Sequence, residues 1–91
     1  MITTQEKATI TKLARRYKVR KIFLFGSSLF SKKGRDIDLA VEGVAPKRFF
    51  SFYTDLYFSL PRPVDLVDLA FDSSFNRMIR EDGLLIYGKP Q

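Results

Sequence analysis

The strongest constraint on the fold is an alternation of short β-forming runs with helical patterns. Runs rich in branched and aromatic residues lie at 19–25, 36–41 and 64–70, and a shorter one follows Gly83. Apolar residues between these runs recur at helical spacing. The order αβ(α)βαβαβ in 91 residues predicts the α/β or α+β class, with a small mixed β-sheet flanked by helices. We expect one domain over residues 1–91.

The expected helices have recognisable ends. Thr3 and Glu6 match a capping box, which predicts a helix over residues 4–17. A second helix is predicted over 46–60, between a proline that suits a first turn and a proline that forbids continuation. The polar residues 72–74 can cap a last helix before the final strand.

Two missing residue types restrict the chemistry. The chain has no histidine and no cysteine. Serine or cysteine triads, imidazole or thiolate zinc sites, and disulfides are therefore excluded. Any reaction must use carboxylates, hydroxyls, basic side chains and backbone groups, and carboxylates suit Mg²⁺ or Mn²⁺.

The hydropathy pattern indicates neither a membrane protein nor a secreted one. The longest strongly apolar run, 22–25, is far below the ~20 residues of a membrane-spanning helix. The polar N-terminal residues lack the apolar region of a secretory signal. A cytoplasmic location without membrane association is the expectation.

The net charge of +6 leaves two interpretations open. It suits an anionic partner such as a nucleotide, a nucleic acid or an acidic protein, and it equally suits simple solubility. No nucleic-acid recognition motif accompanies the charge, so nucleic acid is not the expected partner.

Three aspartates form the main candidate site. Asp36 and Asp38 alternate with one apolar residue on an expected strand, so they project from one face with Cα atoms about 7 Å apart. Alone, this pattern also suits a solvated edge strand or turn. Asp65 interrupts an apolar strand, where its charge needs compensation such as a shared metal ion. Asp68 has the opposite parity and is expected to cap the strand end instead.

Gly26 and Ser27 follow a strand and form a candidate phosphate-binding turn. The glycine permits close backbone approach, and the serine adds a hydroxyl beside the loop amides. In isolation, most Gly-Ser pairs at this position are simple turns. The case for function comes from combining them with the three aspartates.

The combined pattern resembles the DNA polymerase β superfamily. The relevant segments are Gly26-Ser27, Asp36-Ile37-Asp38-Leu39 and Val64-Asp65-Leu66-Val67. Similarity is greatest to the minimal nucleotidyltransferase (MNT) branch, whose closing helix and strand resemble residues 75–87. Eight residues, 28–35, separate the first two motifs, fewer than is usual in the family.

The resemblance implies a polymerase β-like nucleotidyltransferase fold and a reaction that uses ATP and two Mg²⁺ ions. Asp36 and Asp38 would hold Mg²⁺ on the triphosphate, and Asp65 would bind the second ion or deprotonate the acceptor hydroxyl. Gly26, Ser27 and Arg35 would contact the nucleotide. Arg35 and the two lysines before it are equally compatible with a solvated basic loop.

The resemblance also implies a protein partner. MNT proteins pair with helical HEPN proteins, and in several pairs the MNT member is an antitoxin that transfers AMP to a tyrosine of a HEPN RNase toxin. The helix at 46–60 carries one apolar stripe for the core and a second of Phe50, Tyr53 and Tyr57. The second stripe predicts either an interface or a wide buried face.

A catalytically inactive binding module is the competing hypothesis. Such a protein would neutralise a helical partner by contact alone, and the short spacing between Ser27 and Asp36 is compatible with lost activity. Transfer of label from ATP to the partner distinguishes the two hypotheses.

Overall fold

The computed structural model describes residues 2–29 and 36–90. A mixed sheet has the strand order β3-β2-β1-β4. β1 runs antiparallel to β2 and β4, and β2 runs parallel to β3. The elements in chain order are α1 (Thr4–Arg16), β1 (Lys21–Leu24), η1 (Gly26–Leu29), β2 (Ile37–Glu42), η2 (Pro46–Arg48), α2 (Phe49–Ser59), β3 (Val64–Asp68), α3 (Ser74–Asp82) and β4 (Leu84–Tyr87).

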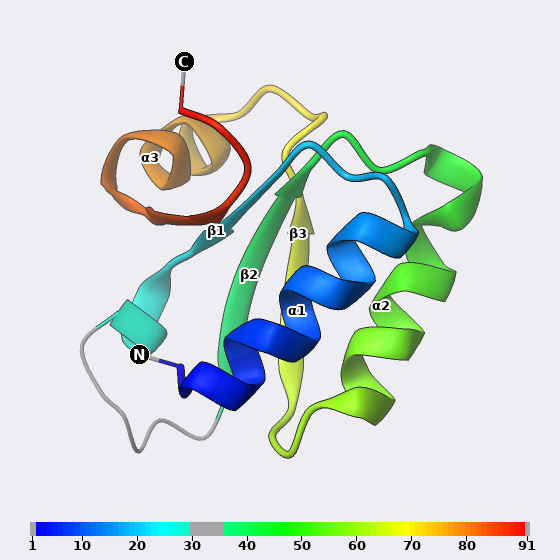
Figure 1. The fold of residues 1–91 in the computed structure, drawn as a ribbon. Coiled ribbons are helices and arrows are strands. Elements are labelled where there is room, and N and C mark those ends of the chain that lie inside the picture. The colour runs from blue at the N-terminus through cyan, green and yellow to red at the C-terminus, as the bar shows by residue number, and fades with distance from the viewer. Residues whose placement is uncertain (1, 30–35, 91) are drawn as a thin grey trace.

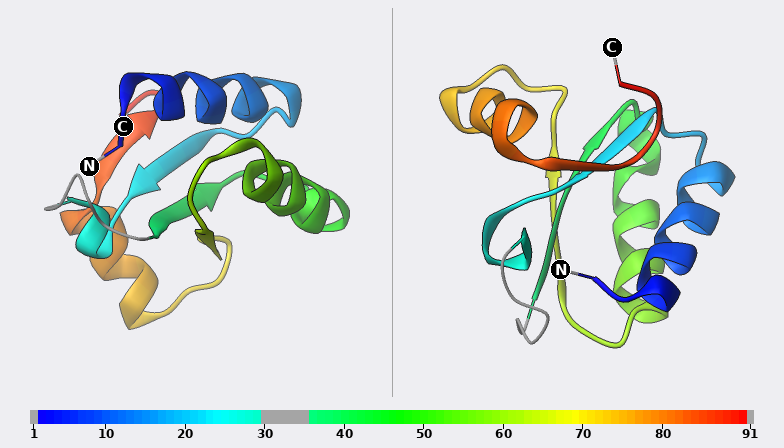
Figure 2. Two further views of the ribbon diagram at one scale, coloured as in Figure 1. Left: turned by 90° about the horizontal axis from the view of Figure 1, so that it is seen from below. Right: turned by 60° about the vertical axis from the view of Figure 1, so that its left-hand side comes forward.

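The helices are divided between the two faces of the sheet. α1 and α2 lie side by side over one face, while α3 lies on the opposite side together with η1 (Figures 1 and 2). The expected mixed sheet flanked by helices is therefore confirmed. Among the described residues, no helix combines the length and apolar character needed to cross a bilayer.

The predicted capping box begins α1. Thr3 Oγ1 accepts a hydrogen bond from Glu6 N–H at 3.0 Å, and Thr3 N–H donates to Glu6 Oε1 at 2.9 Å. The Glu6 carboxylate is buried and accepts two further hydrogen bonds from Arg62, each 2.9 Å long. The start of α1 is thereby tied to the connection between α2 and β3.

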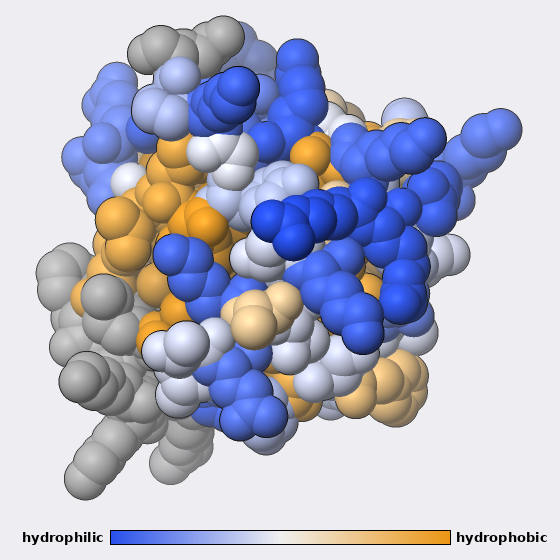
Figure 3. Space-filling view, in the orientation of Figure 1, coloured by the Kyte–Doolittle hydropathy of each residue, from blue (hydrophilic) through white to orange (hydrophobic). Residues whose placement is uncertain are grey.

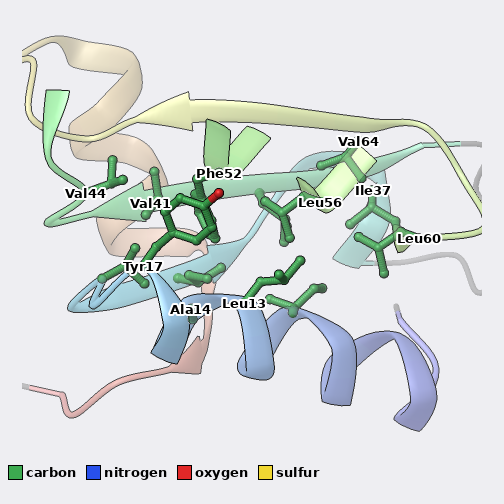
Figure 4. Packing of buried hydrophobic residues seen from close by; sticks show 14 of the residues in the cluster. Leu13, Ala14, Tyr17, Ile37, Val41, Val44, Phe52, Leu56, Leu60 and Val64 are labelled. Atoms are coloured by element: carbon green, nitrogen blue, oxygen red, sulfur yellow. The ribbon is translucent and has the colours of Figure 1, made fainter. Parts of the chain in front are cut away.

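The main core fills the space between the sheet and the helix pair α1 and α2. Phe52 and Leu56 of α2 point towards Leu13 of α1 and towards Ile37 and Val41 of β2, as Figure 4 shows. A smaller cluster lies on the other face, under α3. Its buried members are Phe23, Ala40, Leu69 and Ile79.

Within residues 2–29 and 36–90, the α-helices cover the two faces of the sheet unequally. α3 covers only one end of its face, whereas α1 and α2 run along the whole of the other face (Figure 2). In the view of Figure 3, the side of α1 is mostly hydrophilic and apolar surface gathers beside α3 and β1.

The element boundaries correct several expectations. The strand predicted at 36–41 begins at Ile37, because the first hydrogen bond to the neighbouring segment runs from Ile37 N–H to the Pro63 carbonyl oxygen at 2.8 Å. Asp36 therefore precedes the strand. The helix expected over 46–60 is divided into η2 and α2. β3 ends at Asp68, whose carboxylate accepts from Ala70 N–H at 2.9 Å, as predicted for a residue that caps the strand.

Candidate active site

Two of the three candidate aspartates lie side by side on neighbouring strands. Asp38 of β2 and Asp65 of β3 are Cα partners in the parallel register. Adjacent strands are about 4.8 Å apart, and paired residues point to the same face. Asp38 shares its parity with Ala40, and Asp65 shares its parity with Val67, both in the cluster under α3. Both carboxylates therefore lie on the partly covered face.

The Gly-Ser motif lies next to the two aspartates, because Gly26 is in close contact with Asp38. The Gly26 φ of +66° lies in the left-handed region, and a Cβ added there would be 2.8 Å from Asp38 Oδ2. Only glycine allows the backbone this close to the carboxylate without displacing it. Ser27 lies in η1, which begins at Gly26, and its side chain is outside the described part of the structure. The two motifs, well separated in sequence, meet at Asp38.

Asp36 is an exposed residue two positions before Asp38 and outside the strand. Within residues 2–29 and 36–90, no group of three or more acidic side chains is close enough to hold a metal ion. The structure thus brings Asp38 and Asp65 together by register but does not gather all three carboxylates around one point. Arg35, with the rest of 30–35, lies outside the described residues.

The donor set nonetheless has the chemistry that Mg²⁺ requires. Carboxylate oxygens are hard ligands, and two of them project from adjacent strand positions on one face. Ionised carboxylates this close repel each other unless a cation lies between them. The side chains of Asp38 and Asp65, with Asp36 two residues along, suit a divalent cation.

Tyr53, which the sequence places on the second stripe of the helix, is also a neighbour of this site. Its hydroxyl donates to the Val64 carbonyl oxygen at 2.8 Å, directly before Asp65. Burial, followed by the negative charge of Asp65, raises the pKa of Tyr53. The phenol therefore remains a hydrogen-bond donor at neutral pH and fixes the first residue of β3. The sequence predicted an interface or a buried face for Tyr53, but not its hydrogen bond to β3.

Two of the three residues of the second stripe of α2 are exposed, whereas Tyr53 is half-buried and packs against the main core. Phe50 is 77% and Phe58 81% accessible, and Tyr57 is also exposed, whereas Phe52 and Leu56 are fully buried. The stripe is therefore not buried as a whole: Phe50 and Tyr57 are exposed, and only Tyr53 is partly buried. We call Phe50, Tyr53, Tyr57 and Phe58 the aromatic strip. Together with Thr54, these four residues line a hollow of about 210 Å³.

A second hollow continues from the aromatic strip towards α3. It has a volume of about 510 Å³ and contains Phe50 of the strip together with Val67 and Asp68 of β3. Phe71, 71% accessible, lines its far side. Apolar surface thus follows the β3 edge of the sheet, the same edge from which Asp65 projects.

Comparison with known proteins decides the family. A model of the family "Polymerase beta, Nucleotidyltransferase" matches residues 8–91, which include all the candidate site residues. The chain belongs to the polymerase β nucleotidyltransferase family. No protein with a curated description matches it significantly.

Solved structures narrow the resemblance within this family. A toxin–antitoxin MntA–HepT structure is similar with 27% identity and a TM-score of 0.73, covering 96% of this chain and 74% of that one. A toxin–antitoxin structure with AMP-PNP is 28% identical, with coverages of 91% and 73% and a TM-score of 0.73. A tri-AMPylated Shewanella oneidensis HEPN toxin in complex with MNT antitoxin is matched with 27% identity, coverages of 93% and 71%, and a TM-score of 0.71. The nucleotidyltransferase chain therefore resembles MNT antitoxins.

Proposed function

We propose that this nucleotidyltransferase transfers AMP from ATP to a tyrosine hydroxyl of a HEPN RNase toxin and so acts as an antitoxin. The observation that carries the proposal is the juxtaposition of Asp38 and Asp65 on the partly covered face, with Gly26 against Asp38. The similarity to complexes described as containing AMP-PNP or an AMPylated toxin supports the choice of substrate and acceptor.

The residues divide the work of the reaction. Asp36, Asp38 and Asp65 would hold Mg²⁺, with two ions in the active complex. When bound, these ions stabilise charge on the attacking and leaving oxygens. The backbone at Gly26–Ser27, with Arg35, would bind the phosphates. The acceptor hydroxyl forms a bond to the α-phosphorus, the bond to pyrophosphate breaks, and the hydroxyl proton passes to Asp65.

In-line displacement requires the acceptor and the leaving pyrophosphate to lie on opposite sides of the α-phosphate. The attacking and leaving oxygens lie on opposite sides of the phosphorus, so pyrophosphate leaves towards η1 if the acceptor approaches from β3. Asp65 belongs to β3, the edge strand of the sheet. This assignment makes the β3 edge the entry side for the acceptor.

The aromatic strip suits the acceptor protein on that side. The only charged residue of α2 is Asp55, whose carboxylate accepts from the Tyr17 hydroxyl at 2.5 Å. Aromatic side chains without charges are typical of interface centres. The net charge of +6 opposes pairing with a second copy and favours an acidic partner. We therefore propose that the helical HEPN toxin docks on Phe50, Tyr57 and Phe58.

The test uses a HEPN toxin whose RNase activity this chain suppresses. Toxin and chain are incubated with Mg²⁺ and ATP labelled at the α- or the γ-phosphate. We expect only the α-label on the toxin. Asp38→Asn and Asp65→Asn should abolish transfer, whereas Asp72→Asn, at an exposed aspartate paired with Arg77, should leave it intact.

The competing function predicts a different result. If the toxin is inhibited while neither label reaches it, the catalytic proposal is wrong and the chain neutralises its partner by contact. If both carboxylate variants transfer AMP at the normal rate, the site assignment is wrong. Phe50→Ala and Phe58→Ala should weaken toxin binding under either mechanism.

A further inference from the structure

A pair of aromatic rings stands beside Asp38 on the side away from Asp65. Phe25 N–H donates to the Asp38 carbonyl oxygen at 3.1 Å, which extends the antiparallel β1–β2 register by one residue. Paired residues share a face, so Phe25, Asp38 and Asp65 form a row across three strands. Phe75 of α3 meets Phe25 edge-on, with ring centroids 5.8 Å apart and planes at 84°.

We propose that Phe75, braced by Phe25, is the platform on which the nucleobase of the bound nucleotide stacks. The inference rests on the proposed function, because it assumes that a nucleoside triphosphate occupies the site. The proposed subsite lies beside the carboxylates and the Gly-Ser turn. Its ligand is the nucleobase, an aromatic ring system.

The direction of the nucleotide follows from the position of Gly26. With the leaving phosphates at η1 and the acceptor at β3, the nucleoside is attached through an equatorial oxygen of the α-phosphate and extends across the line of attack. α3 lies on the same side of the sheet as η1, at the other end of the partly covered face (Figure 2). Phe25 directly precedes Gly26, and Phe75 lies over Phe25. A base extending along this face therefore reaches the Phe75 ring.

The packing of α3 does not account for Phe75. Ile79 provides the buried contact of this helix with the sheet, being only 1% accessible. Phe75 remains 49% accessible, so its ring contacts Phe25 and is still partly open to solvent. A half-exposed aromatic ring that is held in place by a second ring can serve as a stacking platform.

The chemistry of the platform predicts weak discrimination between bases. The two rings carry no hydrogen-bonding groups. The next side chain, Asn76, is buried and donates to the carbonyl oxygens of Asp68 and Phe71 at 3.1 and 2.7 Å, so its amide N–H groups are engaged. Stacking recognises the π-face that all bases share. We expect AMP-PNP and GMP-PNP to bind with affinities within a few-fold of each other.

The test compares a nucleotide with its phosphate chain alone. Isothermal titration calorimetry with Mg²⁺ measures the Kd of AMP-PNP and of tripolyphosphate for the chain and its variants. Phe75→Ala should weaken AMP-PNP by roughly 5- to 100-fold, as expected for one lost base stack, and leave tripolyphosphate unchanged. Phe75→Tyr should keep the affinity. Met78→Ala, at another half-exposed apolar residue of α3, is the matched control.

The other possible outcomes contradict the inference, and they show whether the base-stacking subsite or the whole nucleotide site is wrong. If Phe75→Ala binds AMP-PNP within two-fold of the unmodified chain, or loses both compounds equally, the base does not stack there and the proposed function is untouched. If the unmodified chain binds neither compound, the proposed nucleotide site itself is wrong. Circular dichroism of Phe75→Ala establishes that a loss of affinity is not a loss of fold.

Discussion

Replacing Gly26 with alanine tests whether its close approach to Asp38 matters for the reaction. At φ +66° a side chain costs about 1–2 kcal/mol of stability. The new Cβ would be 2.8 Å from Asp38 Oδ2, so the carboxylate has to retreat by about 0.6 Å to reach ordinary contact at 3.4 Å. Since a misplacement of about 1 Å can cost roughly 100-fold in rate, we expect transfer to fall by about 10- to 100-fold.

Gly43 provides the control for backbone strain. Its φ is +91°, and the three atoms nearest to a Cβ there would all belong to the Arg20 side chain, 2.9–3.0 Å away. Gly43→Ala should therefore lose at least as much stability as Gly26→Ala, without touching a candidate site residue. Thermal unfolding reports the strain, with about 4–8 °C of Tm for each kcal/mol in a domain of this size. Transfer of α-label to the toxin reports the site.

The reasoning holds only if Gly26→Ala and Gly43→Ala differ in their rate of AMP transfer. A matching fall in Tm with a rate loss confined to Gly26→Ala supports the contact with Asp38. Equal rate losses would mean that strain alone slows the reaction, and full activity in Gly26→Ala would mean that the position of Asp38 is not constrained by the turn.

Three further predictions concern the framework around the site. Glu6→Gln should destabilise the fold by about 3 kcal/mol at pH 7, because it removes the charge of a buried carboxylate that pairs with the half-buried Arg62. Hydrogen bonding from Arg62 lowers the pKa of Glu6, so in denaturant titrations the difference in stability should shrink as the pH falls below 4.5. Tyr53→Phe removes only the donor to the Val64 carbonyl oxygen and should cost about 1 kcal/mol of stability and slow transfer, whereas unchanged values would show that this bond does not hold β3 in place. Phe52→Ala should cost about 3–5 kcal/mol and leave a largely unfolded protein by circular dichroism, and a cooperative transition near the original Tm would contradict the described core.

The sequence predicts those features that depend on local periodicity and capping. The capping box at Thr3, the parity that separates Asp65 from Asp68 and the turn at Gly26 all arise from residues within a few positions of one another. Strand alternation then determines which side chains share a face. These rules were sufficient for the fold class, whereas the register that pairs Asp38 with Asp65 depends on contacts between strands that the sequence did not predict.

Features that depend on distant contacts were not accessible in this way. The start of β2 is set by the Pro63 carbonyl oxygen, so the parity argument could not place Asp36 outside the strand. The hydrogen bond of Tyr53 and the contact between Phe25 and Phe75 join residues on different elements. Their sequence patterns are those of ordinary apolar positions, because a periodic pattern reports burial and not the identity of the neighbour.

The parallel register of β2 and β3 decides whether the two carboxylates of the candidate site, Asp38 and Asp65, lie side by side. A slip of one residue would turn Asp65 towards the core under α2 and place an apolar side chain beside Asp38. The short connection after α2 sets that alignment. A change in the number of residues in this connection would therefore separate the two carboxylates just as replacing an aspartate would remove one. The connection matters for the site although none of its side chains takes part in the chemistry.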